Sequence, residues 1–138
     1  MTTKKILIII IGVIITGCTQ LPNLGKGYKL IRDGNSDIVI INSRNAFVVE
    51  GVILNYNFDS VFILVEQKPK NLILKDVLYK PENDYPTIEK IFNKSRFRQY
   101  WIINKVIDSV YGPYPKAEYL KKCKNLKVPE GLKLEFGS

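Results

Sequence analysis

An uninterrupted apolar run near the N-terminus decides how much of this chain is free to fold as a domain. Lys4 and Lys5 precede ten consecutive apolar residues, Ile6 to Ile15. A helix rises about 1.5 Å per residue, so a run of this length covers about 15 Å, whereas a bilayer core requires roughly 20 residues. The run is therefore too short for a stable transmembrane anchor and has the length of the apolar core of a secretory signal.

The residues that end this run, Ile15-Thr16-Gly17-Cys18, resemble the lipobox of bacterial lipoproteins. The resemblance implies that the Cys18 thiol receives a diacylglyceryl group and that signal peptidase II cuts between Gly17 and Cys18. Two or three acyl chains are enough for stable membrane anchoring. The alternatives are an ordinary secretory signal and a buried apolar helix that happens to end in cysteine.

The lipoprotein interpretation divides the chain into a signal peptide at 1–17, a lipidated tether at 18–27 and a single domain at 28–138. Processing would leave 121 of the 138 residues, with 19 basic residues against 13 acidic ones. Cys123 would then be the one free thiol, so the domain would depend on its core and not on a disulfide. We expect Cys123 to be a small buried residue and not a nucleophile.

Several segments after the tether have the β-branched and aromatic composition of strands. Asp33-Gly34, between the first two segments, is typical of a hairpin turn. Ile38 to Ile41 and Val61 to Val65 are apolar on both faces, so the second face of the sheet also needs a cover, and helices are the available elements. The expected strands span residues 28–32, 37–42, 47–54, 61–67, 99–104 and 109–113.

Polar and glycine-containing stretches are predicted to interrupt these strands. Asn55 to Ser60 indicate a turn, and Gly51 indicates a bulge or a close approach of two backbones. A hairpin is expected to close at Gly112-Pro113, because proline lacks the amide that a strand ladder needs.

Two helices complete the predicted fold. The first spans residues 87–97, with Asp84 as its cap and Pro86 in its first turn, and the second spans 116–126. Residues 68–85 stay open between helix, strand and loop. The expected fold class is therefore α+β: an antiparallel β-meander of five to six strands, with an inserted helix and a C-terminal helix packed on it.

With these elements assigned, the chain resembles a family of small bacterial lipoproteins known only as a domain of unknown function. The resemblance implies a lipid-anchored sheet domain and no assigned activity. The chain departs from the pattern at Asn104, where similar proteins often have aspartate, and by a long insertion at 70–98. The segments that carry the resemblance are Gly27-Tyr28-Lys29-Leu30, Ile63 to Pro69, Tyr100-Trp101-Ile102-Ile103-Asn104 and Val110-Tyr111-Gly112-Pro113.

Catalytic and metal-binding chemistry find little support in the residue types present. The chain has no histidine, which removes the commonest general base and zinc ligand. The acidic candidates fall in or beside strands and turns, where aspartate commonly bonds to the backbone; they are Glu50, Asp59, Glu66 and Asp108. We expect no enzyme, no metal and no cofactor, although convergent carboxylates in a concave pocket would favour a small hydrolase.

A mixed basic and aromatic segment, Lys90 to Trp101, is the most distinctive candidate for binding. Its predicted surface consists of Arg96, Arg98, Tyr100 and Trp101. In a cytosolic protein this mixture would suggest nucleic acid, but the export signal argues against that partner. The alternative is a solvated basic surface beside an aromatic core.

These observations predict a non-catalytic protein held at the bacterial cell envelope by membrane lipid on Cys18. Its domain is expected to bind a protein, a peptide or another envelope component. An immunity or inhibitor lipoprotein, which protects against a toxin or lytic enzyme, is the alternative, and a small hydrolase comes third. The choice between inner and outer membrane and the oligomeric state both stay open.

Overall fold

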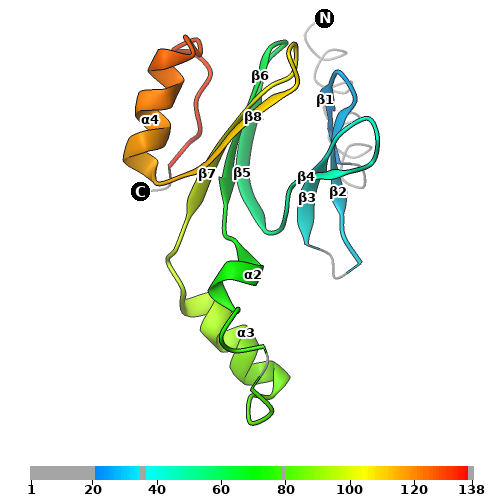
Figure 1. The fold of residues 1–138 in the computed structure, drawn as a ribbon, viewed down its shortest axis with the longest axis vertical. Helices are drawn as coiled ribbons and strands as arrows, with labels where there is room; N and C mark the ends of the chain where they lie inside the picture. The colour runs from blue at the N-terminus through cyan, green and yellow to red at the C-terminus, as the bar shows by residue number, and fades with distance from the viewer. Residues whose placement is uncertain (1–20, 35–36, 79, 137–138) are drawn as a thin grey trace, which may run out of the picture.

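The computed structural model of the chain describes residues 21–34, 37–78 and 80–136. In this part of the chain, antiparallel strands form two sheets of four strands each, with their order following the sequence (Figure 1). The first sheet contains β1 (Asn23–Gly25), β2 (Tyr28–Arg32), β3 (Ile38–Ile41) and β4 (Phe47–Val49). The second sheet contains β5 (Ile53–Phe58), β6 (Phe62–Gln67), β7 (Gln99–Asn104) and β8 (Ser109–Tyr114).

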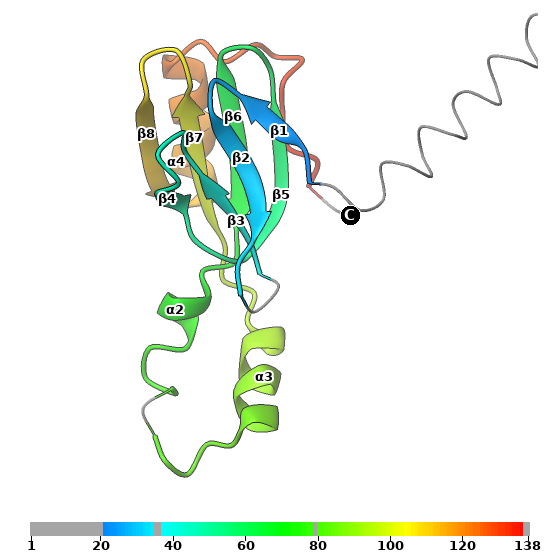
Figure 2. The same cartoon turned by 90° about the vertical axis from the view of Figure 1, so that its right-hand side faces the viewer.

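The two sheets and the C-terminal helix α4 (Lys116–Asn125) form three layers (Figures 1 and 2). One core lies between the sheets and contains Leu24, Leu30 and Ile63. The other core lies between the second sheet and α4, where the Tyr100 and Tyr119 rings stack with their centroids 5.2 Å apart. The predicted α+β class, the antiparallel strands and the packed C-terminal helix are confirmed.

Strands β6 and β7 lie in the middle of these layers, which explains their apolar residues on both faces. Ile63 and Val65 face the first sheet, whereas Leu64 and Ile102 face α4. The sequence predicted that helices would cover the second face of the sheet, and α4 covers it, while the first sheet covers the other face.

The strand count exceeds the predicted five to six because two segments were assigned differently. Residues 47–54, expected as one strand, are divided at Gly51 between β4 and β5, which belong to different sheets. Strand β1 lies inside the expected tether and pairs with β2. Its Leu24 is fully buried, so the folded body starts before the predicted boundary at Tyr28.

The predicted turn at Asn55 to Ser60 is wrong, because β5 continues to Phe58. The asparagines that suggested a turn bond to the C-terminal segment instead. The Nδ2 of Asn55 donates to the Glu135 carbonyl at 2.7 Å, and that of Asn57 donates to the Lys133 carbonyl at 3.0 Å. These polar side chains therefore attach the chain end beside an edge strand.

The ladder also continues past Gly112-Pro113, where the sequence predicted its end. Tyr100 pairs with Tyr114 and Ile102 pairs with Tyr111, with an irregularity between them. Strand β8 is at the edge of the second sheet, where proline is tolerated because only one side of the strand is paired. A Cβ on Gly112 would lie 2.9 Å from the Tyr100 carbonyl oxygen, so this irregularity requires glycine.

Residues 68–85, left open by the sequence, contain the short helix α2 (Lys70–Ile73). The next helix, α3 (Tyr85–Lys94), is the predicted inserted helix, and its cap is confirmed because the Asp84 Oδ1 accepts the Thr87 amide at 3.0 Å. Residues 70–78 and 80–94 form what we call the lobe. The lobe projects from the end of the layers opposite to the β1–β2 and β7–β8 turns (Figures 1 and 2). No helix within the described ranges has the length and apolar character needed to cross a membrane.

Candidate functional site

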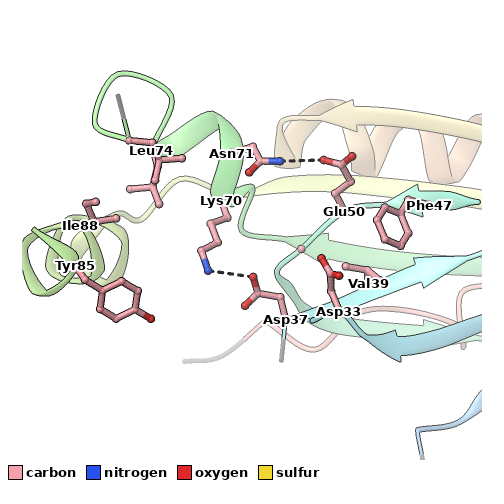
Figure 3. Close-up of a pocket in the computed structure, with 12 residues that line it drawn as sticks. Asp33, Asp37, Val39, Phe47, Glu50, Lys70, Asn71, Leu74, Tyr85 and Ile88 are labelled. Carbon is pink, nitrogen blue, oxygen red and sulfur yellow. Dashed lines mark hydrogen bonds and ion pairs between the residues drawn. The ribbon is translucent and has the colours of Figure 1, made fainter. Parts of the chain in front are cut away.

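A groove of about 390 Å³ lies where the lobe meets the first sheet (Figure 3). Strands β3 and β4, the turn before β3 and the segment after β4 supply one wall, and α2, α3 and the segment after α2 supply the other. Its apolar lining consists of Val39, Phe47, Leu74, Leu78, Tyr85 and Ile88. Its polar lining consists of Asp33, Asp37, Glu50, Lys70 and Asn71. We call this site the lobe groove.

The base of the lobe is held to the connection between β4 and β5 by backbone hydrogen bonds. Val52 and Lys68 exchange amide-to-carbonyl bonds of 2.8 and 2.9 Å, and the Lys70 amide donates to the Gly51 carbonyl at 3.2 Å. Gly51 is also the predicted close approach, because a Cβ there would lie 3.0 Å from the Cβ of Asp37. This wall of the groove is therefore fixed by main chain.

Two side-chain contacts cross the groove from the lobe to the first sheet (Figure 3). The Lys70 Nζ lies 3.1 Å from the Asp37 Oδ2, and the Asn71 Nδ2 donates to the Glu50 Oε2 at 3.2 Å. Asp37 thus has a cationic partner, whereas Glu50 accepts from a neutral amide. These contacts connect the two walls of the groove.

Helix α3 is attached to the lobe base through its Phe92 ring. The Lys68 Nζ lies 4.3 Å from the ring centroid, at a distance typical of a cation–π contact. Lys68 is buried, and burial, followed by the nearby Arg98 charge, lowers the pKa of its ammonium group. The aromatic ring thus partly compensates for the water that this cation has lost.

The four residues of the predicted basic and aromatic surface do not come together. Tyr100 is buried against α4, and its hydroxyl donates to the Glu66 Oε2 at 3.3 Å. Trp101 points to the opposite face of β7, and its Nε1 donates to the Gln67 Oε1 at 2.7 Å. Arg98 donates to the Phe97 carbonyl at 2.9 Å, while Arg96 is exposed. Alternation along the strand separates the two aromatic residues.

The other acidic candidates have structural partners away from the lobe groove. The Asp59 Oδ1 accepts the Val61 and Phe62 amides at 2.8 and 2.7 Å, as the turn interpretation predicted. Asp108 accepts the Tyr28 hydroxyl at 2.9 Å. Burial and this contact raise the pKa of Tyr28 to about 12. Of the four, only Glu50 lines the groove.

Sequence reasoning missed most of this site because its residues lie in turns and in the stretch left unassigned. The sequence predicts Asp37 in a strand, and it leaves the stretch that contains Lys70 open between helix, strand and loop. A usable signal was present in Leu72, Leu78 and Tyr85, which are large apolar side chains in a polar, proline-rich stretch and are exposed in the structure. Exposed apolar residues of this kind often mark contact surfaces.

The described residues contain no cluster of three or more side chains suited to holding a metal ion. Cys123 is half-buried beside Tyr119, and burial raises the pKa of its thiol above the usual range. Cys18 and Gly17, the predicted lipidation and cleavage residues, lie outside the described residues. The lobe groove, which brings three carboxylates, a lysine and exposed aromatic side chains together, is therefore the candidate site.

Fold and groove together define a small α+β protein with two antiparallel sheets, a packed C-terminal helix and a projecting helical lobe. Over residues 25–136 the chain matches the family described as Protein of unknown function (DUF3997). The chain belongs to this family, and the predicted membership of a domain-of-unknown-function family is confirmed. No curated protein and no solved structure matches the chain.

Proposed function

We propose that this protein is a lipid-anchored, non-catalytic binding protein of the bacterial cell envelope, and that it holds a protein or peptide in the lobe groove. The observation that carries the proposal is the exposed aromatic surface on both walls of the lobe groove. Tyr85 is 76% exposed at the groove, and Phe47 faces it from the first sheet with 52% exposed. Large aromatic side chains kept in water at a concave site favour contact with a partner.

The partners and the exposure of the groove carboxylates favour a binding function over hydrolysis. Acid catalysis at neutral pH requires a carboxyl group held protonated by an apolar environment or a close carboxylate. Asp37 is instead ion-paired with Lys70, and Glu50 is exposed and accepts a hydrogen bond from Asn71. Neither carboxylate therefore has the fully apolar surroundings of an acid catalyst.

The position of β1 limits how far a lipid anchor on Cys18 could lie from the folded body. Leu21 packs against the core between the sheets, only three residues after Cys18. Three residues span at most about 11 Å. An acylated Cys18 would therefore hold the body directly at the membrane surface, and not on the longer flexible tether that the sequence suggested.

Replacing the proposed lipidation residue tests the anchoring part of the proposal. We expect Cys18→Ser to abolish palmitate incorporation, to retain the uncleaved signal peptide and to lower the share of the protein that partitions into the detergent phase. Cys123→Ser is the matched control and should label like the wild type. Equal palmitate labelling of wild type and Cys18→Ser would contradict lipid anchoring.

The binding part is tested in intact cells with a photoreactive amino acid at position 85 of the full-length protein. We expect illumination to crosslink Tyr85-substituted protein to a defined envelope polypeptide. The same group at Leu120, exposed on α4 and outside the groove, should not capture that species. A captured toxin or lytic enzyme would favour the immunity alternative. Recovery of phospholipid alone would overturn the polypeptide-binding proposal.

A further inference from the structure

The charge of the lobe groove is opposite to that of the chain as a whole. The full chain has a formal net charge of +8. The groove lining contains the carboxylates of Asp33, Asp37 and Glu50 against the single ammonium group of Lys70. An acidic concave site on a basic protein attracts cations and repels other acidic surfaces.

Two of these carboxylates have no cationic partner among the described residues. Lys70–Asp37 is the one ion pair found in that part of the chain. Asp33 accepts the Gly34 amide of its own turn at 2.7 Å, and Glu50 accepts the Asn71 amide group. Asp33 and Glu50 therefore present negative charge to whatever enters the groove.

The apolar lining shows that a simple cation would leave most of the groove unused. Val39 and Leu74 are buried in the lining of the two walls, while Phe47 and Tyr85 expose aromatic surface on opposite walls (Figure 3). A guanidinium or ammonium group interacts favourably with carboxylates and with aromatic faces. An adjacent aliphatic or aromatic side chain interacts favourably with the apolar lining. One ligand with both features matches the whole lining.

Resting on the proposed binding function, we infer that the lobe groove selects a polypeptide segment in which arginine or lysine stands next to a large apolar residue. The basic side chain reaches Asp33 and Glu50, and its apolar neighbour packs against the exposed ring of Phe47 on the same wall of the groove (Figure 3). The occupant is thus a cationic segment of a partner protein, and not a second copy of this chain or a free small cation.

An immobilised hexapeptide library, varied at four central positions, tests this selectivity on the full-length protein in detergent micelles. We expect peptides with Arg or Lys beside Trp, Phe or Leu to bind about tenfold more tightly than peptides with Glu in the basic position or Ser in the apolar position. Raising the salt concentration should weaken the basic preference.

Single substitutions then separate the two halves of the ligand. Glu50→Gln should reduce the preference for basic residues, and Phe47→Ser should reduce the preference for apolar ones, each without loss of helix signal. Glu118→Gln, an exposed carboxylate of α4, is the matched control and should bind like the wild type. A library without basic preference, or an unchanged preference in Glu50→Gln, would overturn the inference.

Two further outcomes are distinguishable. Self-association of the wild type that Glu50→Gln abolishes would assign the groove to a second copy and would also overturn the inference. Capture of an envelope polypeptide at position 85, together with a library that shows no basic preference, would refute the ligand class but leave the proposed function standing. The reverse pair of results would refute the envelope function and retain the ligand class.

Discussion

The three-layer body and the lobe of this protein are stabilised in different ways. The body has two apolar cores, and its central strands β6 and β7 contribute to both. In the lobe, Leu74 is the one buried apolar side chain among the described residues, and α3 buries none of its residues. Isolated helices of this length are marginal in water, so α3 depends on its few contacts with the lobe base.

The body therefore supplies the stability of the fold, whereas the lobe supplies exposed side chains that can contact a partner. Besides the backbone hydrogen bonds at its base, the lobe is attached by side-chain contacts: an ion pair, an amide-to-carboxylate bond and a cation–π contact. Contacts of this kind at a surface contribute little individually. The lobe is therefore free to keep apolar side chains exposed at the groove without weakening the body that carries it.

The largest expected effect comes from isoleucine-to-alanine substitutions in the two regions. Ile63 is fully buried in β6, and we expect Ile63→Ala to lower the free energy of unfolding by about 2–5 kcal/mol. Ile91 is 36% exposed on α3, and Ile91→Ala should change it by less than about 0.5 kcal/mol. Urea unfolding of both variants beside the wild type measures the difference.

The same pair of variants could also break the comparison. If Ile91→Ala lowered the unfolding free energy as much as Ile63→Ala, the lobe would have to fold as one cooperative unit with the body. The lobe would then be a structural element, and the exposed side chains of α3 would need a different explanation.

A smaller effect is expected at the Tyr28 hydroxyl, at the end of the body away from the lobe. The raised pKa of about 12 means that between pH 10 and 12 unfolded chains release this proton while folded chains retain it. Stability conferred by the protonated hydroxyl is therefore complete below pH 10 and is lost as the pH rises to 12. Burial also raises the pKa of Tyr100 and of Tyr119, which act in the same direction.

We expect Tyr28→Phe to lower the free energy of unfolding by about 1 kcal/mol at neutral pH, because the hydrogen bond to Asp108 is lost. The same variant should make the alkaline decline, the fall of this free energy between pH 10 and 12, less steep. Asp108→Asn is the matched variant, since asparagine tolerates the positive φ of +51° at this position. It should reduce the alkaline decline only in part, because burial is the larger cause of the raised pKa. Chemical unfolding at pH 8 and pH 11 measures both variants. An alkaline decline that is unchanged in Tyr28→Phe would contradict this account.

The sequence predicted the body better than the lobe for a physical reason. Burial on two faces produces the continuous apolar run that identified β6, and the Asp84 cap with Pro86 identified α3. The groove depends instead on Asp37, Glu50 and Lys70, which lie far apart in the sequence and meet only because α2 returns to the first sheet. No local pattern encodes that return.

Alternation also explains why the predicted binding surface was not assembled. Tyr100 and Trp101 are adjacent in sequence, and in a strand adjacent side chains point to opposite faces. The two rings therefore lie on opposite sides of β7, where Tyr100 donates to Glu66 and Trp101 donates to Gln67. Counting aromatic residues along a predicted strand without separating its faces overestimates the surface that they can share.

The smallest expected effect is confined to the lobe and concerns the cap of α3. Asp84→Ala removes the acceptor of the Thr87 amide, so the amides of α3 should exchange several-fold faster while the unfolding of the body stays unchanged. Asp84→Ser retains an acceptor, so the α3 amides of this variant should exchange like those of the wild type.

Hydrogen bonds from Thr87 hold the pKa of the Asp84 carboxyl below its usual range. The cap is therefore fully effective above about pH 4 and is lost as the pH falls toward the pKa of the folded state. Acidification should therefore weaken α3 in the wild type but not further in Asp84→Ala, as α-carbon chemical shifts would show. If Asp84→Ala lowered the unfolding free energy of the body as well, lobe and body would be coupled more tightly than their contacts indicate.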